Sequence, residues 1–470
     1  MRTTLADPIL EAWEATRTRS HDRGAIVNVG GKVVRTFSQI EERAGHFVRQ
    51  LETIAPGQIF AIQIGNHPDW PSLFLACLRK QLVVLPLEKT ISDEQKQSAF
   101  QICHVVATAV SDGRDVQILP TGTAVARRDP AANDWGNDWP SLLKLTSGTT
   151  GAPRAVRFRS EQLLADCENI CETMGISQRD LNFGVIPISH SYGFSNLLTP
   201  LIVRGASLVL SNDRIPRAII DGLAATRATV FPGMPVFYQS FCEMAEAPSL
   251  PDLGLCISAG APLGPETAQA FCGKFGREIH SFYGASECGG ICYAREAQPI
   301  PGFVGEPMSG VQIEQVDPAN LVSLIRVRSG AVATVYFPEP DEGKLGGGIF
   351  VPDDLLEKTR GGYRIVGRSS DSINVAGKKV HPAEVEAEIL RCEGVQAVIV
   401  FGRESERRNE EIAACVVAKG LSERELLAHC RARLSSWQVP RRVYFVEAIP
   451  VNERGKTSRR ELARRYPVVR

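Results

Sequence analysis

The chain has 470 residues, of which 43% are hydrophobic, and its 53 lysines and arginines are balanced by 53 aspartates and glutamates. This length exceeds what one hydrophobic core normally organises, so we expect two or more domains. The charge balance leaves no net positive field for nucleic acid and so argues against a nucleic-acid-binding protein.

The amino terminus and the cysteines indicate a compartment. Residues Met1 to Pro8 contain no apolar core of signal-peptide length, and later apolar runs are broken before they reach membrane-spanning length. The twelve cysteines are scattered, without the spacing of a disulfide scaffold or a zinc site. We therefore expect a cytoplasmic protein with reduced thiols and with neither a transmembrane segment nor a structural metal.

Segments that favour strands alternate with segments that favour helices along most of the chain. An amphipathic helix is predicted from Ser38, which would act as its cap, with Glu41 three residues later. Short, apolar predicted strands lie at residues 59–64, 82–87, 207–210 and 255–258. This alternation predicts an α/β architecture with buried strands.

The pattern restarts after Gly367. Before it, the glycine-rich break Gly343 to Gly348 predicts a flexible loop. After it, a helix should begin near Pro382, because proline suits a first turn and glutamates follow. Further strands and a helix are predicted at residues 372–375, 397–401, 412–417 and 423–430. A separate α+β carboxy-terminal domain of about a hundred residues is expected.

One segment reads as a loop that holds phosphates. Residues 146–154 are Thr-Ser-Gly-Thr-Thr-Gly-Ala-Pro-Arg. Its glycines let the backbone approach a ligand closely, its hydroxyls can donate to phosphate oxygens, and Arg154 supplies positive charge. The spacing of Gly148, Gly151 and Arg154 is not that of a Walker loop. On composition alone, an ordinary polar turn is the simpler interpretation.

Other motifs follow that segment in order and change this interpretation. They are Pro187 to Gly193, Ser258 to Leu263, Tyr283 to Glu287, Gly305 to Gly310, Asp354, Gly367 to Asp371, Val375 to Glu386 and Asn452 to Lys456. On this ordered set, nearly the whole chain resembles the adenylate-forming superfamily of acyl- and aryl-CoA synthetases, peptide-synthetase adenylation domains and firefly luciferase. The resemblance implies a large amino-terminal domain of layered α/β sheets (residues 1–367) and a small mobile α+β domain (residues 368–470).

The resemblance also implies a two-step reaction. A carboxylate attacks the α-phosphate of Mg-ATP to give an acyl-adenylate and pyrophosphate, and a thiol then displaces AMP. The residues implied to bind ATP are Thr146, Ser147, Gly148, Thr149, Thr150, Gly151, Arg154, Gly260, Ala261, Pro262, Tyr283, Gly284, Ala285, Ser286, Asp354 and Arg368.

Residue roles follow from the same resemblance. Residues 146–154 would hold the β- and γ-phosphates, Ser286 would contact the α-phosphate, and Glu287 would bind Mg²⁺. Lys456 would bridge the substrate carboxylate and the α-phosphate, a task that suits a long, flexible cation. The implied catalytic set is Lys456, Glu287, Arg154 and His190.

The nucleoside would be held by Tyr283, stacked on adenine, and by Asp354, which would accept hydrogen bonds from the ribose. Asp353 competes for that role, since the usual threonine-glycine-aspartate pattern is absent around Pro352. Arg368 would contact the ribose and phosphate region.

The carboxy-terminal part should turn between the two half-reactions. Ser370 falls at the hinge, where the family more often has aspartate or lysine, and Gly377 would line the thiol tunnel. Arginines beside Lys456, including Arg459 and Arg460, are expected to receive the phosphates of CoA or an acidic carrier-protein surface.

The implied acyl pocket consists of His190, Phe231, Gly233, Ser258, Ala259 and Gly260. His190 either gates acyl entry or merely packs. No aspartate follows it where amino-acid-activating domains hold the substrate ammonium, so an α-amino acid is disfavoured. We expect a fatty or aryl acid, which places the protein in fatty acid metabolism or a related use of acids.

Three departures from the family pattern leave alternatives open. Arg154 replaces the usual lysine, Ala155 the usual glycine, and Asn374 a common lysine. A non-catalytic nucleotide- or acyl-binding homologue is therefore an alternative, as is a luciferase-like oxidase. The sequence also leaves open whether the thiol is CoA or the phosphopantetheine of an acyl carrier protein, as it would be for a ligase that loads carriers.

Overall fold

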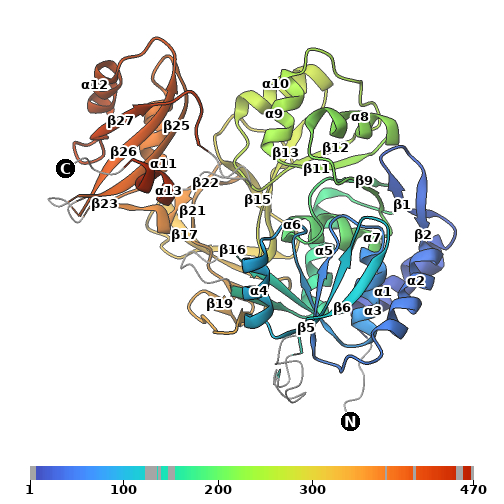
Figure 1. The fold of residues 1–470 in the computed structure, drawn as a ribbon. Helices are drawn as coiled ribbons and strands as arrows, with labels where there is room; N and C mark the ends of the chain where they lie inside the picture. Colours follow the sequence, from blue (N-terminus) through green and yellow to red (C-terminus); the bar gives the residue numbers. More distant parts are fainter. Residues whose placement is uncertain are drawn as a thin grey trace. The chain divides into compact units, whose positions relative to one another are not determined.

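The computed structural model describes residues 7–121, 135, 139–146, 154–375, 378–405, 409–450 and 459–466. Two compact units make up the chain (Figure 1). The larger unit contains Met1–Glu314 and Arg326–Pro352, and the smaller unit contains Gln315–Ile325 and Asp353–Arg470. The predicted division into domains of residues 1–367 and 368–470 stays a prediction.

A parallel sheet forms the centre of the larger unit. Its strands, in spatial order, are β1 (Gly24–Asn28), β10 (Ser207–Leu210), β9 (Leu181–Gly184), β11 (Val230–Gly233), β12 (Leu255–Ser258) and β13 (Ile279–Ala285). Parallel strands buried on both faces read as continuous apolar runs, which is why the sequence predicts β10 and β12 well. Figure 1 shows α8 (Pro216–Thr226), α9 (Pro235–Glu243) and α10 (Pro265–Phe275) beside β11 to β13.

A second sheet in this unit carries the ends of the phosphate-loop motif. Its spatial order is β18 (Val335–Phe337), β8 (Arg154–Phe158), β7 (Leu142–Thr146), β4 (Val83–Pro86), β3 (Ile59–Gln63), β5 (Val105–Ser111) and β6 (Val116–Pro120). Strands β7 and β8 are antiparallel, with Thr146 opposite Arg154. The motif therefore connects two neighbouring strands of one sheet.

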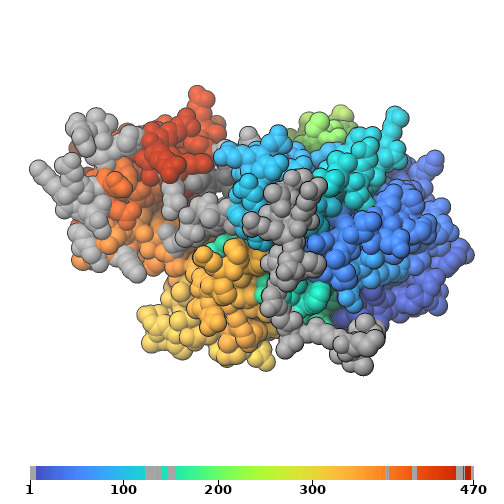
Figure 2. Space-filling model, turned by 60° about the horizontal axis from the view of Figure 1, so that its bottom comes forward, coloured from blue at the N-terminus to red at the C-terminus, as the bar shows by residue number. Residues whose placement is uncertain are grey.

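The remaining elements of the larger unit cover these sheets or extend them. The helices are α1 (Pro8–Ser20), α2 (Phe37–Gln50), α3 (Trp70–Arg79), α4 (Asp93–Ile102), α5 (Ser160–Met174), α6 (Ser191–Gly193) and α7 (Thr199–Val203). The strands are β2 (Val33–Thr36), β14 (Gly289–Tyr293), β15 (Phe303–Pro307), β19 (Leu345–Gly346) and β20 (Ile349–Phe350). Two of the three unit boundaries fall within β16 (Val311–Gln315) and β17 (Val322–Ser329). In the space-filling view the amino-terminal residues, in blue, gather over one part of the larger unit (Figure 2).

The predicted cap of the first amphipathic helix is wrong by two residues. Helix α2 is capped by Thr36, whose hydroxyl accepts from the Gln39 amide while the Gln39 side chain accepts from the Thr36 amide. The chain reaches Thr36 as the last residue of β2, so the turn into the helix comes earlier than Ser38. Glu41 instead accepts a hydrogen bond from the Trp13 indole and pairs with Arg79.

The predicted flexible loop at Gly343 to Gly348 is largely a tight hairpin. Leu345 pairs with Phe350 and Gly346 with Ile349, which leaves Gly347 and Gly348 as the turn. Both turn residues have positive φ, 59° and 74°. A two-residue turn of this hand requires left-handed backbone at both positions, and glycine adopts it without strain.

The smaller unit is an α+β domain, as the sequence predicts. Its main sheet has the order β24 (Lys378–Val380), β23 (Ile373–Val375), β26 (Asn409–Ala418) and β25 (Val395–Ser405), and β27 (Arg442–Phe445) also pairs with β26. It also contains the hairpin of β21 (Asp354–Thr359) and β22 (Gly362–Arg368) and the short 3-10 turn η4 (Ser369–Asp371). Its helices are α11 (Pro382–Leu390), α12 (Glu423–Arg433) and α13 (Arg459–Arg465).

The two faces of β26 explain how these helices pack. Ile412 and Val416 join the core beneath α11 and α12, whereas Ala413 and Cys415 join a second core with Leu462 of α13. Alternate residues of a strand point to opposite faces, so one face of β26 packs against α11 and α12 and the other face packs against α13. No helix among the described residues is long and apolar enough to cross a membrane.

Candidate active site

Several predicted site residues follow the carboxyl ends of the parallel strands. Segments of this kind come together at one edge of a parallel sheet, where α/β proteins bind ligands. The Ser191 hydroxyl donates to the Ser286 hydroxyl at 2.9 Å. The Tyr192 hydroxyl donates to the Gly233 carbonyl at 3.3 Å. The motifs around His190, Gly233 and Ser286 therefore contact one another, although they are far apart in the sequence.

His190 is exposed and forms the cap of the short helix α6. Its Nδ1 accepts a hydrogen bond from the Tyr192 amide at 3.3 Å. Tyr192 lies beside it, and burial raises the pKa of its phenol, so that hydroxyl stays protonated and keeps donating. The expected gating role of His190 stays a prediction.

Asn66, which the sequence analysis did not single out, fixes the segment that leads to His190. Its side-chain nitrogen donates to the carbonyls of Gly184, Ile186 and Ser211 at 3.0 to 3.2 Å. Its side-chain oxygen accepts from the Ile188 amide at 2.9 Å. Asn66 is 5% exposed and follows β3, so it joins the second sheet to the ends of β9 and β10.

The phosphate-loop motif is described only at its ends. The Thr146 hydroxyl donates to the Arg154 carbonyl at 3.3 Å. The Arg154 guanidinium lies 3.5 Å from Asp341 and 5.5 Å from the ring centre of Tyr336. The predicted residues Ser147, Gly148, Thr149, Thr150 and Gly151 lie outside the described residues.

Glu287 is connected to Arg154 through Tyr336. The Tyr336 hydroxyl donates to Glu287 Oε1 at 3.1 Å, and the Glu287 carbonyl accepts from the Ala333 amide at 2.9 Å. Burial is the main cause, and the negative charge of Glu287 the next, of a pKa of the Tyr336 phenol far above its ordinary value. The structure thus brings together two predicted residues and one, Tyr336, that carries no motif signal.

The predicted acyl-pocket residues differ in exposure. Phe231, Ser258 and Ala259 are 0%, 2% and 6% exposed. The Phe231 ring packs against Phe183 and Tyr238, with centroids 6.2 and 5.5 Å away. The predicted nucleotide residues Gly260, Ala261 and Pro262 are exposed beyond the end of β12.

The remaining predicted site residues of the larger unit are Tyr283, Gly284 and Ala285. They form the end of β13, and Ser286 and Glu287 follow directly. Tyr283 is 7% exposed, whereas Gly284 is exposed at this strand end. An added Cβ on Gly284 would lie 2.6 Å from the Gly289 carbonyl oxygen, so the strand end accepts only glycine here.

In the smaller unit, Asp354 and Arg368 lie opposite each other on β21 and β22. Arg368 Nε and Asp354 Oδ1 are 2.9 Å apart. Asp353 instead presents its carbonyl to the Ser369 amide at 2.7 Å. Ser370 lies in the middle of η4, and Gly377 and Lys456 lie outside the described residues.

Arg459 has a different environment from the one expected. Its guanidinium donates to Asp371 at 2.5 Å, to both oxygens of Glu386 at 2.8 and 3.1 Å, and to the Val400 carbonyl at 2.9 Å. Glu386 also accepts from the Val400 amide at 2.7 Å. Carboxylates of its own unit thus bind the Arg459 guanidinium, and the expectation that Arg459 receives the phosphates of CoA or an acidic carrier-protein surface stays a prediction.

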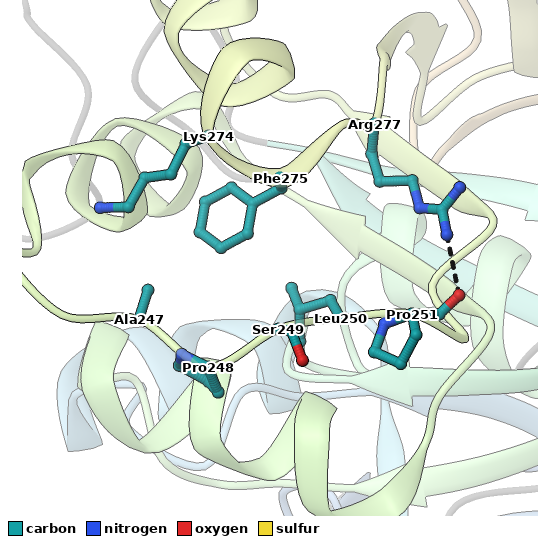
Figure 3. Close-up of a pocket in the computed structure, with 8 residues that line it drawn as sticks. All are labelled: Ala247, Pro248, Ser249, Leu250, Pro251, Lys274, Phe275 and Arg277. Atoms are coloured by element: carbon teal, nitrogen blue, oxygen red, sulfur yellow. Dashed lines mark hydrogen bonds between the residues drawn. The ribbon is translucent and has the colours of Figure 1, made fainter.

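A surface pocket lies at the opposite ends of the same strands (Figure 3). It is lined by Ala247 to Pro251, by Lys274 and Phe275 at the end of α10, and by Arg277 beyond it. Lys274 donates to the carbonyls of Phe241, Cys242 and Met244, and Arg277 donates to the Pro251 carbonyl at 2.8 Å. Both cations are held by main-chain carbonyls, and none of the lining residues belongs to the predicted acyl pocket, so this is a different pocket.

Comparison with known proteins defines the class. The model of the AMP-binding enzyme family matches residues 13–337, and that of the AMP-binding enzyme C-terminal domain matches residues 384–456. The chain therefore belongs to the AMP-binding enzyme family. The expected resemblance to adenylate-forming enzymes is confirmed.

The relatives are CoA ligases of several acids. A feruloyl-CoA synthase from Amycolatopsis sp is 26% identical, with 97% of this chain and 99% of the relative covered. An oxalate–CoA ligase from Arabidopsis thaliana is 25% identical, with 98% and 99% covered. A long-chain-fatty-acid–CoA ligase from Escherichia coli is 24% identical, with 97% and 94% covered.

Solved structures confirm the predicted fold. ATP-bound MatB from Rhodopseudomonas palustris is 23% identical and has a TM-score of 0.83, with 97% of this chain and 99% of MatB covered. A benzoate CoA ligase from Burkholderia xenovorans is 22% identical and has a TM-score of 0.80, with 98% and 100% covered. At these identities the similarity concerns the fold.

Proposed function

We propose that this protein is an acid–thiol ligase that activates a carboxylic acid with ATP and transfers the acyl group to CoA. The observation that carries the proposal is the contact of Arg154 and Glu287 with one side chain, Tyr336, beside the end of the phosphate-loop motif. A cation and a carboxylate held this close suit a metal-bound polyphosphate. The names of the relatives support CoA as the thiol acceptor.

In this proposal the larger unit binds ATP. The segment 146–154 holds the β- and γ-phosphates, and its Arg154 supplies the positive charge that neutralises them. Ser286 donates to the α-phosphate. The Ser191 hydroxyl supports this role, because it donates to Ser286 and leaves the Ser286 proton free to point elsewhere. Asp354 and Arg368 would exchange part of their mutual pairing for the ribose hydroxyls.

The residues present fit Mg²⁺. Glu287 is partly exposed, and a carboxylate oxygen, together with phosphate oxygens and water, is the ligand type that Mg²⁺ prefers. When bound, Mg²⁺ would neutralise charge on the phosphates of ATP. Glu287 would hold the ion, and Lys456 would bring the acid carboxylate to the α-phosphate.

The acid is proposed to be apolar, either fatty or aryl. Support comes from the aromatic cluster around Phe231 and from Gly233, where an added Cβ would lie 2.8 Å from the Phe231 ring. A carrier-protein thiol in place of CoA, and a place in the cytoplasm, stay predictions.

Acid-dependent ATP–pyrophosphate exchange tests the proposal. The panel should contain benzoate, hydroxycinnamates, fatty acids of graded length and dicarboxylates. We expect exchange with at least one aryl or fatty acid, and a thioester of the matching mass once CoA is added. A carrier protein with its phosphopantetheine arm, supplied in place of CoA, distinguishes the two acceptors. A folded protein that binds ATP but exchanges with no acid contradicts catalysis and favours the binding-only alternative.

We expect arginine at position 154 to support ATP binding better than lysine would. Arg154→Lys keeps the positive charge but loses the planar group that lies over Tyr336. We expect the KM for ATP in the exchange assay to rise about 3- to 10-fold. Arg157→Lys, on the same strand, is the matched control. Higher activity in Arg154→Lys would instead show that the native arginine is a partial defect.

A further inference from the structure

We infer that Tyr336 is a positioning residue that holds Glu287 through its hydroxyl and Arg154 through its ring, in place for the metal and the phosphates. The inference rests on the proposed function, since it assigns Tyr336 to the same ATP site. It adds a residue and a task that neither the motifs nor the relatives' names supply.

The first support is the position of Tyr336 in the sheet. It is the central residue of β18 and lies opposite Val156 of β8, the strand that begins at Arg154. Tyr336 is 6% exposed, so its ring has a fixed place beside the end of the phosphate-loop motif. Burial of this kind gives the ring few alternative rotamers.

The second support is that Glu287 is held at two points by the same segment. The Ala333 amide donates to the Glu287 carbonyl at 2.9 Å, and the Tyr336 hydroxyl donates to the carboxylate at 3.1 Å. The main-chain contact fixes the start of the side chain, and the phenol fixes one of its oxygens. The phenol thereby orients the carboxylate that would bind a metal.

The third support is the arginine. The Arg154 guanidinium lies 5.5 Å from the Tyr336 ring centre and 3.5 Å from Asp341. One aromatic side chain thus contacts the glutamate through its hydroxyl and the arginine through its ring. The hydroxyl orients the glutamate, and the ring, together with Asp341, holds the arginine.

Two substitutions separate the two tasks. Tyr336→Phe removes the hydroxyl and keeps the ring, whereas Tyr336→Leu removes both. We expect Tyr336→Phe to weaken Mn²⁺ binding to the protein–ATP complex about 3- to 10-fold, measured by electron paramagnetic resonance, with metal-free ATP affinity within twofold of the native protein. Tyr336→Leu should weaken Mn²⁺ binding and also metal-free ATP binding, measured by calorimetry in EDTA.

Tyr293→Phe is the matched control, because Tyr293 is a buried tyrosine of the same unit stacked on His280. It should leave both affinities unchanged. Unchanged Mn²⁺ affinity in Tyr336→Phe, or an equal loss in Tyr293→Phe, would overturn the inference. These measurements need neither acid nor turnover. Native Mn²⁺–ATP binding without exchange would therefore remove the proposed ligase activity and leave the role of Tyr336 intact.

Discussion

Replacement of Lys456 by alanine should lower acid-dependent ATP–pyrophosphate exchange about 100- to 1,000-fold. In the proposed mechanism its ammonium joins the carboxylate and the α-phosphate only as the adenylate forms, so the loss should appear in kcat. Thioester formation from supplied acyl-adenylate and CoA should stay within about twofold of the native rate, because that step does not need this cation. Rapid quench of each half-reaction measures both.

Lys419→Ala is the matched control for Lys456→Ala, since Lys419 is an exposed lysine of the same unit. It should change neither half-reaction. An equal loss of both half-reactions in Lys456→Ala would contradict the assigned role and indicate damage to the smaller unit.

Asn66→Ala should lower the free energy of unfolding by about 3 to 5 kcal/mol. The change removes a hydrogen bond from three carbonyls and one amide at a buried position, and of the carbonyls Gly184 still accepts from the Ser211 amide. Denaturant unfolding, followed by tryptophan fluorescence, measures the shift in midpoint.

Asn212→Ala provides the comparison, because Asn212 is exposed and bonds the main chain of Asn66 through both side-chain atoms. Its loss should cost about 1 kcal/mol, since water can replace an exposed side chain. Equal midpoints for the two variants would show that the Asn66 side chain does not connect the two sheets.

Much of the fold could be predicted because the buried strands are recognisable in the sequence as short apolar runs. The strands predicted at residues 207–210 and 255–258 coincide with β10 and β12, since strands buried on both faces are uniformly apolar. The cap of α2 could not be predicted in this way. Thr36 and Ser38 are equally good caps locally, and the choice between them depends on where β2 ends.

The candidate site was predictable only where a motif is continuous in sequence. Tyr283 to Glu287 form such a run, and their relation to Ser191 then follows from the parallel strands. Tyr336 contacts a residue 49 positions away, and Asn66 contacts carbonyls 118 to 145 positions away. A single tyrosine or asparagine gives no local signal of such partners, because sheet pairing alone decides which segments meet.

The contacts of Arg459 restrict how chimeric enzymes can be assembled from members of this family. Asp371, Glu386 and Arg459 come from three separate segments of the smaller unit, and the guanidinium binds both carboxylates at once. A crossover placed between residues 371 and 459 would combine at least one of the two carboxylates from one parent with the arginine of another. A junction before Asp371 keeps all three in one parental sequence, and is therefore the one we would choose for domain exchange.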